Sequence, residues 1–224
     1  PNAGLVPEVS HNINAGIMYQ KTAIRIELNG FYRKTFNTIY LRTSRFFAQY
    51  QNLLEAEIKG VEADFMLTPV KGLTISLNAT YQDIINKSKG DKSGTIDDRY
   101  YNARLPNIPI YYTNQELRYK LPGSLTNMVN LELWWNAYYT GAFFLSWEQD
   151  GIRNKKAQVP AQFIQNTGIT ISKEGLPLTF SFEVFNLTNT MAHDNFNVQK
   201  PGRAFSARLR FYIDNLKLNN KSGD

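Results

Sequence analysis

LTISLNATYQ, residues 73–82, alternates apolar and polar side chains without a break. Successive side chains of a β-strand point to opposite faces of its sheet, so this stretch predicts a strand with one apolar and one polar face. The same pattern recurs at 24–32 and 129–139. The predicted strands run to about nine residues or more, which is the length that a tilted strand needs to cross a bilayer, whereas soluble strands usually have about five or six residues.

The connections between the predicted strands alternate between tight and long. In an antiparallel up-and-down sheet, this puts every tight turn at one end and every long loop at the other, as in an outer-membrane β-barrel. Tight links fall near 20–22, 68–72, 121–127 and 173–177, and longer polar ones fall at 33–45, 83–105, 141–159 and 188–203. The predicted fold class is all-β, an antiparallel up-and-down transmembrane β-barrel segment of about nine strands. We expect these strands at 10–20, 23–33, 51–67, 72–83, 110–121, 127–140, 160–173, 177–187 and 203–213.

Composition narrows the classes of protein. The chain has 224 residues and no cysteine, which excludes a disulfide framework and a thiolate metal site. No run reaches the roughly 18 to 20 apolar residues of a membrane helix, and this excludes a helical membrane protein. The formal net charge of +6 is spread along the chain, so no nucleic-acid partner is expected. The 13 Tyr and 14 Phe fit the aromatic girdles of a membrane barrel, and the alternative is a soluble sandwich with a large aromatic core.

The polar faces of the predicted strands carry charge. Glu116, Arg118 and Lys120 share one face, which a dry core would not accept without ion pairing but a water-filled or plug-filled interior would. In the strand predicted at 51–67, the apolar parity shifts by one residue at Gly60. The shift predicts a β-bulge at Lys59–Gly60. Both flanks of the sheet are expected to be open edges.

The last predicted strand has the sharpest alternation, with Phe205, Leu209 and Phe211 on one face and Arg208 on the other. It resembles the C-terminal targeting strand of bacterial outer-membrane barrels, in which an aromatic residue is usually terminal. Here the chain continues through 214–224. We therefore expect Phe205, Leu209 and Phe211 to form the assembly-signal strand, residues 1–213 to form the barrel portion, and residues 214–224 to form a tail.

Short blocks then occur in a fixed order: Leu5–Glu8, Tyr50–Asn52 with Gly60–Glu62, Arg104–Pro109, Val184–Asn189 and Pro201–Arg203. Together they resemble the C-terminal β-barrel portion of TonB-dependent outer-membrane receptors, especially those of Bacteroidetes-like bacteria. The resemblance implies a barrel of about 22 strands around an N-terminal plug. Nine strands are under half of such a barrel, so the chain is expected to be a fragment without the plug or the segment that contacts the energy complex.

The resemblance also implies a function in the bacterial outer membrane: a scarce extracellular nutrient binds the loops and upper plug, and the TonB energy complex drives its import. The block 194–203 resembles siderophore-type receptors more than glycan importers, so a ferric siderophore is the favoured ligand. Aromatic rings stack on catecholate or sugar rings and arginine pairs with anionic chelates, which makes residues of the long loops the candidate contacts. These are Arg99, Tyr100, Tyr101, Phe143, Phe144 and Trp147. Each one also suits an interface girdle or plain loop packing. The expected partners are outer-membrane lipid, the rest of the barrel with its plug, and the TonB complex.

The sequence bears on two other function classes. A porin-like or adhesive β-protein without energised transport is the alternative function. An enzyme is not expected, because His193 beside Asp194 would need a serine oxygen within hydrogen-bond reach, from Ser172, Ser181 or Ser206. Neither a cofactor nor a metal site is expected, since Asp91, Asp97 and Asp98 lack the ligand spacing of a calcium loop.

Overall fold

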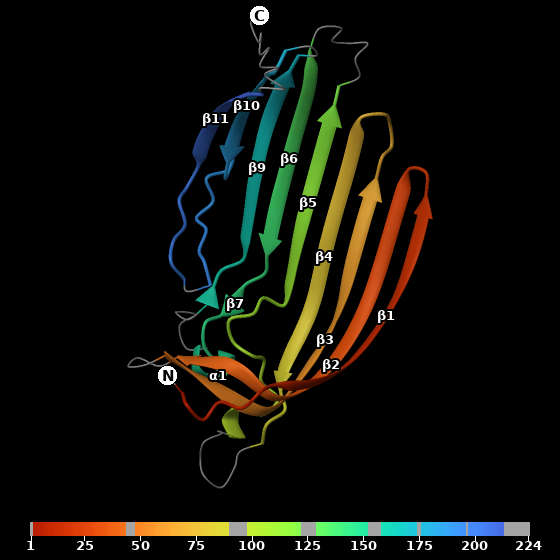
Figure 1. The fold of residues 1–224 in the computed structure, drawn as a ribbon. Coiled ribbons are helices and arrows are strands. Elements are labelled where there is room, and N and C mark those ends of the chain that lie inside the picture. The colour runs from red at the N-terminus through yellow and green to blue at the C-terminus, as the bar shows by residue number, and fades with distance from the viewer. Residues whose placement is uncertain are drawn as a thin grey trace, which may run out of the picture.

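A computed structural model of the chain describes residues 2–43, 48–89, 98–121, 129–151, 158–173, 176–195 and 197–212. Within these residues, nine antiparallel strands form one sheet in the order β1-β2-β3-β4-β5-β6-β9-β10-β11 (Figure 1). Their bounds are Val9–Lys21 (β1), Ile24–Thr43 (β2), Ala48–Leu67 (β3), Leu73–Asn86 (β4), Tyr111–Lys120 (β5), Asn130–Thr140 (β6), Gln162–Ser172 (β9), Leu178–Phe185 (β10) and Ala204–Phe211 (β11). The predicted nine-stranded all-β architecture is confirmed.

Four short elements that the sequence did not predict lie in the long connections. They are the strands β7 (Phe143–Phe144) and β8 (Gln158–Val159), which pair with each other, the 3₁₀ turn η1 (Asp98–Tyr100) and the helix α1 (Glu148–Gly151). In the described part of the chain, no helix is long and apolar enough to cross a membrane. These elements lie at one end of the sheet, which we call the long-loop end, and the tight turns lie at the other (Figure 1).

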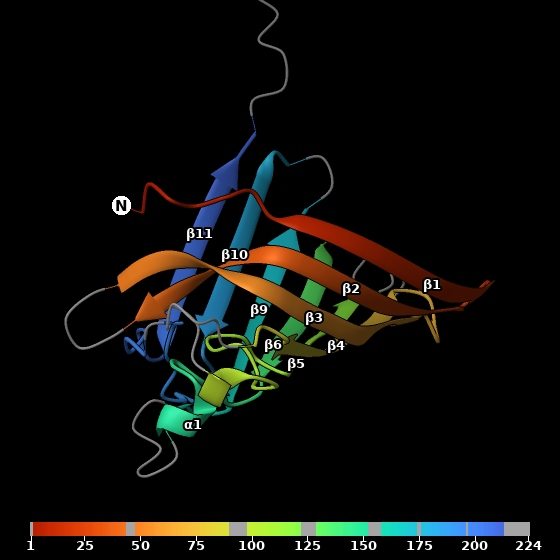
Figure 2. The same cartoon turned by 90° about the horizontal axis from the view of Figure 1, so that it is seen from below.

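The predicted long connection at 33–45 is wrong in its extent. β2 continues to Thr43 and pairs with β3 from Ala48 onward in one register. Figure 2 shows the far ends of these two strands turning away from β4 and reaching across the long-loop end of the sheet. Residues 33–43 lack the apolar alternation of a membrane-crossing strand. A prediction based on that alternation therefore ends β2 too early.

The β-bulge predicted at Lys59–Gly60 is also wrong. Phe31 and Tyr32 of β2 face Gly60 and Lys59 in unbroken sequence, and on the other side Gly60 faces Gln82 of β4. The shift arises because the two faces of β3 change in character along the strand: the outer face is apolar near the tight turns and charged near the long loops, and the inner face does the opposite. Toward the long-loop end, Ala56 is fully buried on the polar face, and the outer face becomes charged.

The apolar faces of the strands do not meet in a core. Leu77 is 37% exposed, Leu133 40%, Phe182 38% and Leu209 68%, although a sandwich would bury all four. Phe205 and Phe211 on β11 are exposed in the same way. Such a large exposed apolar surface marks contact with lipid or another protein.

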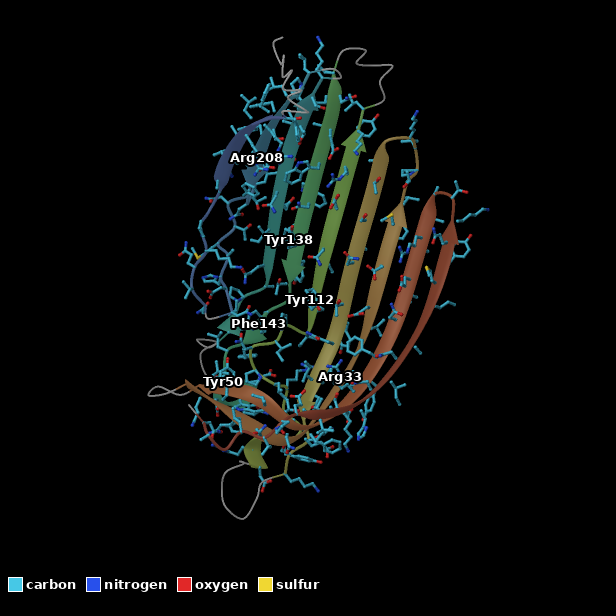
Figure 3. The ribbon with its side chains drawn as sticks, in the orientation of Figure 1. Arg33, Tyr50, Tyr112, Tyr138, Phe143 and Arg208 are labelled. Atoms are coloured by element: carbon cyan, nitrogen blue, oxygen red, sulfur yellow. The ribbon has the colours of Figure 1, made fainter. Side chains whose placement is uncertain are left out.

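The opposite face of the sheet is polar and lines its concave side. Near the tight turns, Arg118 Nη1 lies 2.7 Å from Glu132 Oε1 on the next strand, and Arg118 Nε lies 2.9 Å from Glu116 Oε1. Figure 3 labels four residues of this face on strands from β2 to β11: Arg33, Tyr112, Tyr138 and Arg208. The predicted division of the sheet into an apolar face and a polar, charged face is confirmed.

Tyrosines end the apolar face toward the long loops. The rings of Tyr111 and Tyr139 stack with centroids 5.3 Å apart, and Tyr81 is the Cα partner of Tyr111. On β4 the apolar face runs from Leu73 to Tyr81, which is about 27 Å along the strand and about 20 Å in height at the usual barrel tilt. This is close to the apolar band of about 25 Å in known outer-membrane barrels.

Beyond the tyrosines, the outer face carries ion pairs. Lys34 Nζ lies 2.8 Å from Glu55 Oε1, and Arg104 Nε lies 2.8 Å from Asp83 Oδ1. Moving such ion pairs out of water into lipid would be costly. The ends of the strands near the long loops therefore extend beyond the apolar band. At these ends the outer face is charged, and the inner face can carry apolar residues.

Candidate functional site

The predicted contact residues gather at the long-loop end, on two segments that are distant in sequence. The rings of Tyr100, in η1, and Trp147, just before α1, stack with centroids 4.7 Å apart at an interplanar angle of 13°. The Tyr100 hydroxyl donates to Asp150 Oδ2 at 2.7 Å. Trp147 is only 6% exposed, so this pair holds the two loops together more than it offers an open surface.

The segment after η1 is fixed to the end of β4 by Asn86. The Asn86 side-chain amide donates to the Tyr100 carbonyl oxygen at 2.8 Å, and its backbone exchanges hydrogen bonds with Asn102 and Ala103. Asn102 takes a left-handed conformation, with φ at 60°, which asparagine tolerates better than most residues. The loop thereby turns back along the sheet.

Under this turn lies a small apolar cluster. Ala56, Ala103, Leu105 and Trp147 are its buried members, and Ile84, Tyr100 and Ile108 pack against them. Ala56 belongs to β3, so this cluster explains why the inner face of β3 is apolar at its long-loop end. It gives the outer loops a rigid base.

Arg99 and Tyr101 are the exposed members of the predicted set. The Arg99 guanidinium lies 5.4 Å from the centroid of the Tyr100 ring, and the Lys89 amine lies 5.6 Å from that of Tyr101. A cation over the face of an aromatic ring is attracted to it electrostatically. Of the six predicted residues, these two are best placed to meet a ligand from outside.

Phe143 and Phe144 lie in the β7–β8 hairpin rather than on the open surface. Phe143 is buried and pairs with Val159, while the Phe144 carbonyl oxygen accepts from the Asn107 amide at 2.6 Å. The hairpin is thus tied to the segment that follows η1. The structure brings Tyr100, Trp147 and this hairpin into one platform.

The edge of the platform carries an ion pair. Arg104 donates to Asp83 at 2.8 Å, and this hydrogen bond raises the pKa of the Arg104 guanidinium above its usual range. Lys87 donates to Asn102 Oδ1 at 2.9 Å nearby. Among the described residues, no group of three His, Asp or Glu side chains is placed to hold a metal ion.

Among the residues that the structure describes, no serine hydroxyl is hydrogen-bonded to the His193 ring. Its buried Nδ1 has no hydrogen-bond partner in the part of the chain that the structure describes, and the Ser181 hydroxyl is paired with Thr170 instead. Of the three aspartates considered for calcium, Asp91 and Asp97 lie outside the described residues. The predicted tail, 214–224, lies outside them as well.

Sequence reasoning missed the residues of the concave wall near the long-loop end. Tyr138 is exposed there although it has the parity of Asn130, Glu132 and Asn136, and Phe185 is exposed at the end of β10. The signal that could have identified them is an aromatic residue, such as Tyr138, on the polar face of a strand. Neither contact with lipid nor burial in a dry core explains an aromatic residue there.

Comparisons with known proteins agree with this geometry. A family model described as TonB dependent receptor-like, beta-barrel, matches residues 1–216. A variant of the ferric enterobactin receptor PfeA from Pseudomonas aeruginosa is similar over 94% of this chain and 32% of its own, with 20% identity and a TM-score of 0.64. The ferric preacinetobactin receptor BauA from Acinetobacter baumannii is similar over 89% of this chain and 29% of its own, with 16% identity and a TM-score of 0.66.

The copper transporter OprC is also similar, over 93% of this chain and 32% of its own, with 16% identity and a TM-score of 0.64. No curated protein matches the sequence. The chain spans about a third of the length of the solved structures, between 29% and 32% for these three. At such identities the likeness concerns the fold.

Proposed function

We propose, since this chain belongs to the TonB dependent receptor-like β-barrel family, that it is the C-terminal part of a receptor in the bacterial outer membrane. The receptor binds a scarce extracellular nutrient at the long-loop end and imports it with energy from the TonB system. A ferric siderophore is the favoured nutrient. The missing strands and the plug complete the barrel from the open edges of β1 and β11.

The observation that carries this proposal is the direction of the two faces. Leu77, Leu133 and Leu209 are exposed on one face, and Arg118 with its two carboxylate partners lies on the other. A membrane barrel needs this arrangement because lipid surrounds it and water or a plug fills it. An adhesive sandwich would instead bury the leucines in its core and expose the charged residues to solvent.

The long-loop platform supports an anionic ligand. Arg99 and Tyr101 are exposed, whereas the charge of Arg104 is paired with Asp83. The platform is held in shape by the four other predicted residues, Tyr100, Phe143, Phe144 and Trp147. Guanidinium groups and aromatic faces together suit the oxygen-rich anionic surface of a ferric chelate.

Uptake by the full-length receptor tests the proposal. Cells lacking their own siderophore receptors would express it and be supplied with radioactive iron as ferric siderophores, or with oligosaccharides, with and without a working TonB system. Iron uptake that requires TonB is the expected result. Passive, TonB-independent entry of either solute would support the porin-like alternative and contradict the proposal.

The double variant Arg99→Ala/Tyr101→Ala tests the platform separately. It should weaken siderophore binding about ten-fold, since a charge-assisted contact and a stacking contact are both lost. Lys71→Gln, an exposed residue in a tight turn at the opposite end, is the matched control and should bind normally. Normal binding by the double variant would remove these two residues from the ligand surface.

A further inference from the structure

We propose that a cavity in the concave wall, between β6, β9 and β10 and residues 186–195 and 197–203, is a ligand subsite for a planar anionic group such as a catecholate or an aromatic carboxylate. The inference rests on the proposed function, because it places one arm of the imported chelate in this cavity. The cavity has a volume of about 450 Å³. Ligand pockets commonly have volumes of about 300 to 1,000 Å³.

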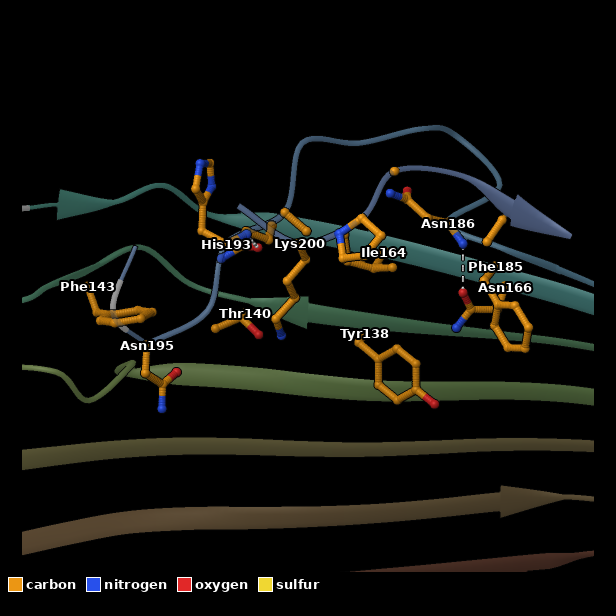
Figure 4. A pocket seen from close by; sticks show the side chains of 15 residues that line it. Tyr138, Thr140, Phe143, Ile164, Asn166, Phe185, Asn186, His193, Asn195 and Lys200 are labelled. Atoms are coloured by element: carbon orange, nitrogen blue, oxygen red, sulfur yellow. Dashed lines mark hydrogen bonds between the residues drawn. The ribbon is translucent and has the colours of Figure 1, made fainter. Parts of the chain in front are cut away.

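The walls of the cavity are aromatic and aliphatic. Tyr138 of β6 is 45% exposed and faces Ile164 of β9, while Phe185 at the end of β10 is 40% exposed. Phe143, from the β7–β8 hairpin, lies at one end of the cavity (Figure 4). Ring faces at the edge of a cavity favour a flat ring between them.

A single cation reaches into this space. In Figure 4 the Lys200 side chain extends toward Thr140, and Asn195 lies on the same side. Lys200 makes no ion pair with any residue that the structure describes, and the nearby Asp194 Oδ1 accepts a hydrogen bond from the Val198 amide within its own turn. The amine is therefore available to an anion, and an ammonium group pairs strongly with carboxylate or phenolate oxygens.

The segment that carries Lys200 is held in place by amide side chains. The Asn186 backbone amide donates to Asn166 Oδ1 at 2.8 Å, and the Asn166 amide donates to Asn136 Oδ1 at 2.9 Å. Further along, the His193 backbone amide donates to Gln162 Oε1 at 2.7 Å. A cavity that is already in shape binds its ligand with little ordering cost.

The His193 ring does not contribute to this site. Figure 4 shows the imidazole pointing away from Lys200 and Tyr138, so the residue lines the cavity with its backbone. The recognising groups are accordingly one amine, three aromatic rings and a few amides. An anionic ring can pair with the exposed amine and stack on the walls, whereas a neutral sugar brings no charge to the amine.

Binding of ferric catecholate to the purified full-length receptor tests the subsite. Lys200→Gln should weaken the affinity about ten-fold, and Lys200→Arg, which keeps the charge, should stay within about three-fold of the unchanged receptor. Tyr138→Leu removes the ring face and should also weaken binding. Lys59→Gln, on the outer face of β3, is the matched loss of one lysine and should have no effect.

The outcomes separate this inference from the proposed function. If the receptor binds ferric catecholate and Lys200→Gln binds it equally well, the subsite is wrong and the function stands. If Lys200→Gln instead exposes the plug to protease while the affinity is unchanged, the cavity receives the plug and the subsite is again wrong. If the receptor imports no ferric siderophore, the proposed function fails, and weaker binding of free 2,3-dihydroxybenzoate by Lys200→Gln would still support the subsite.

Discussion

The side-chain amide of Asn52 donates to the backbone carbonyl oxygen of Asn37 at 2.6 Å, across the β2–β3 pair. Asn37 has φ at 56°, so β2 bends at this residue. The same Asn52 amide donates to the Val6 carbonyl oxygen at 3.0 Å, and its Oδ1 accepts from the Val6 amide at 3.0 Å. Asn52 therefore fixes the bend and ties the N-terminal segment to the part of the hairpin that crosses the long-loop end (Figure 2).

Asn52→Ala should loosen this hairpin without unfolding the sheet. The variant loses three hydrogen bonds, each worth about 1 kcal/mol. Hydrogen exchange of the full-length receptor should show faster exchange in the far ends of β2 and β3 and unchanged exchange in β4. Asn12→Ala, which removes one exposed side-chain contact to Ser10, is the control. Equal protection in both variants would mean that Asn52 does not hold the bend.

Gly60→Ala should destabilise the barrel more than Gly30→Ala. A Cβ at Gly60 would lie 2.3 Å from the Phe31 ring and 2.4 Å from the Tyr81 carbonyl oxygen, whereas at Gly30 the nearest atom would lie 3.8 Å away. Overpacking of this kind costs about 1 to 3 kcal/mol. The measurement is the thermal midpoint of each full-length receptor in detergent. A midpoint for Gly60→Ala as high as that for Gly30→Ala would contradict the close packing.

Trp147→Ala should disorganise the outer platform while the strands remain paired. Removing a buried tryptophan costs about 3 to 5 kcal/mol, and here the loss falls on the two loops that the Tyr100–Trp147 stack joins. Limited proteolysis should cleave these loops faster, and siderophore affinity should fall. Trp147→Phe keeps an aromatic partner for Tyr100 and should resemble the unchanged receptor. Unaltered proteolysis of Trp147→Ala would show that the stack is dispensable.

The sequence was sufficient to predict the membrane-crossing strands, because lipid on one side and water on the other leave a two-residue period. It was not sufficient beyond the tyrosines. There the outer face is charged at Lys34 and Glu55, and Ala56 is buried on the inner face, so the parity of β3 reverses without a bulge. The true end of β2 was missed for the same reason.

The six contact residues stay a prediction, and the structure adds how their two loops fold together. Long polar loops identified Arg99 through Trp147 as neighbours of the outside, but the stacking of Tyr100 on Trp147 depends on how two separate loops fold together. No local pattern contains that information. The cavity that Tyr138 and Lys200 line could not be predicted from the sequence, because it depends on how the segment that carries Lys200 runs over the concave wall.

The most direct test of the account compares an arginine at two adjacent positions of β4. Leu77 lies on the exposed apolar face, and Asn78 lies on the polar face, where its amide donates to Asp64. Leu77→Arg should cost about 2 to 4 kcal/mol in a bilayer and strongly reduce the folded receptor recovered from outer membranes, judged by heat-modifiable migration, while Asn78→Arg should be recovered almost normally. Normal recovery of Leu77→Arg together with loss of Asn78→Arg would contradict the assignment of the two faces.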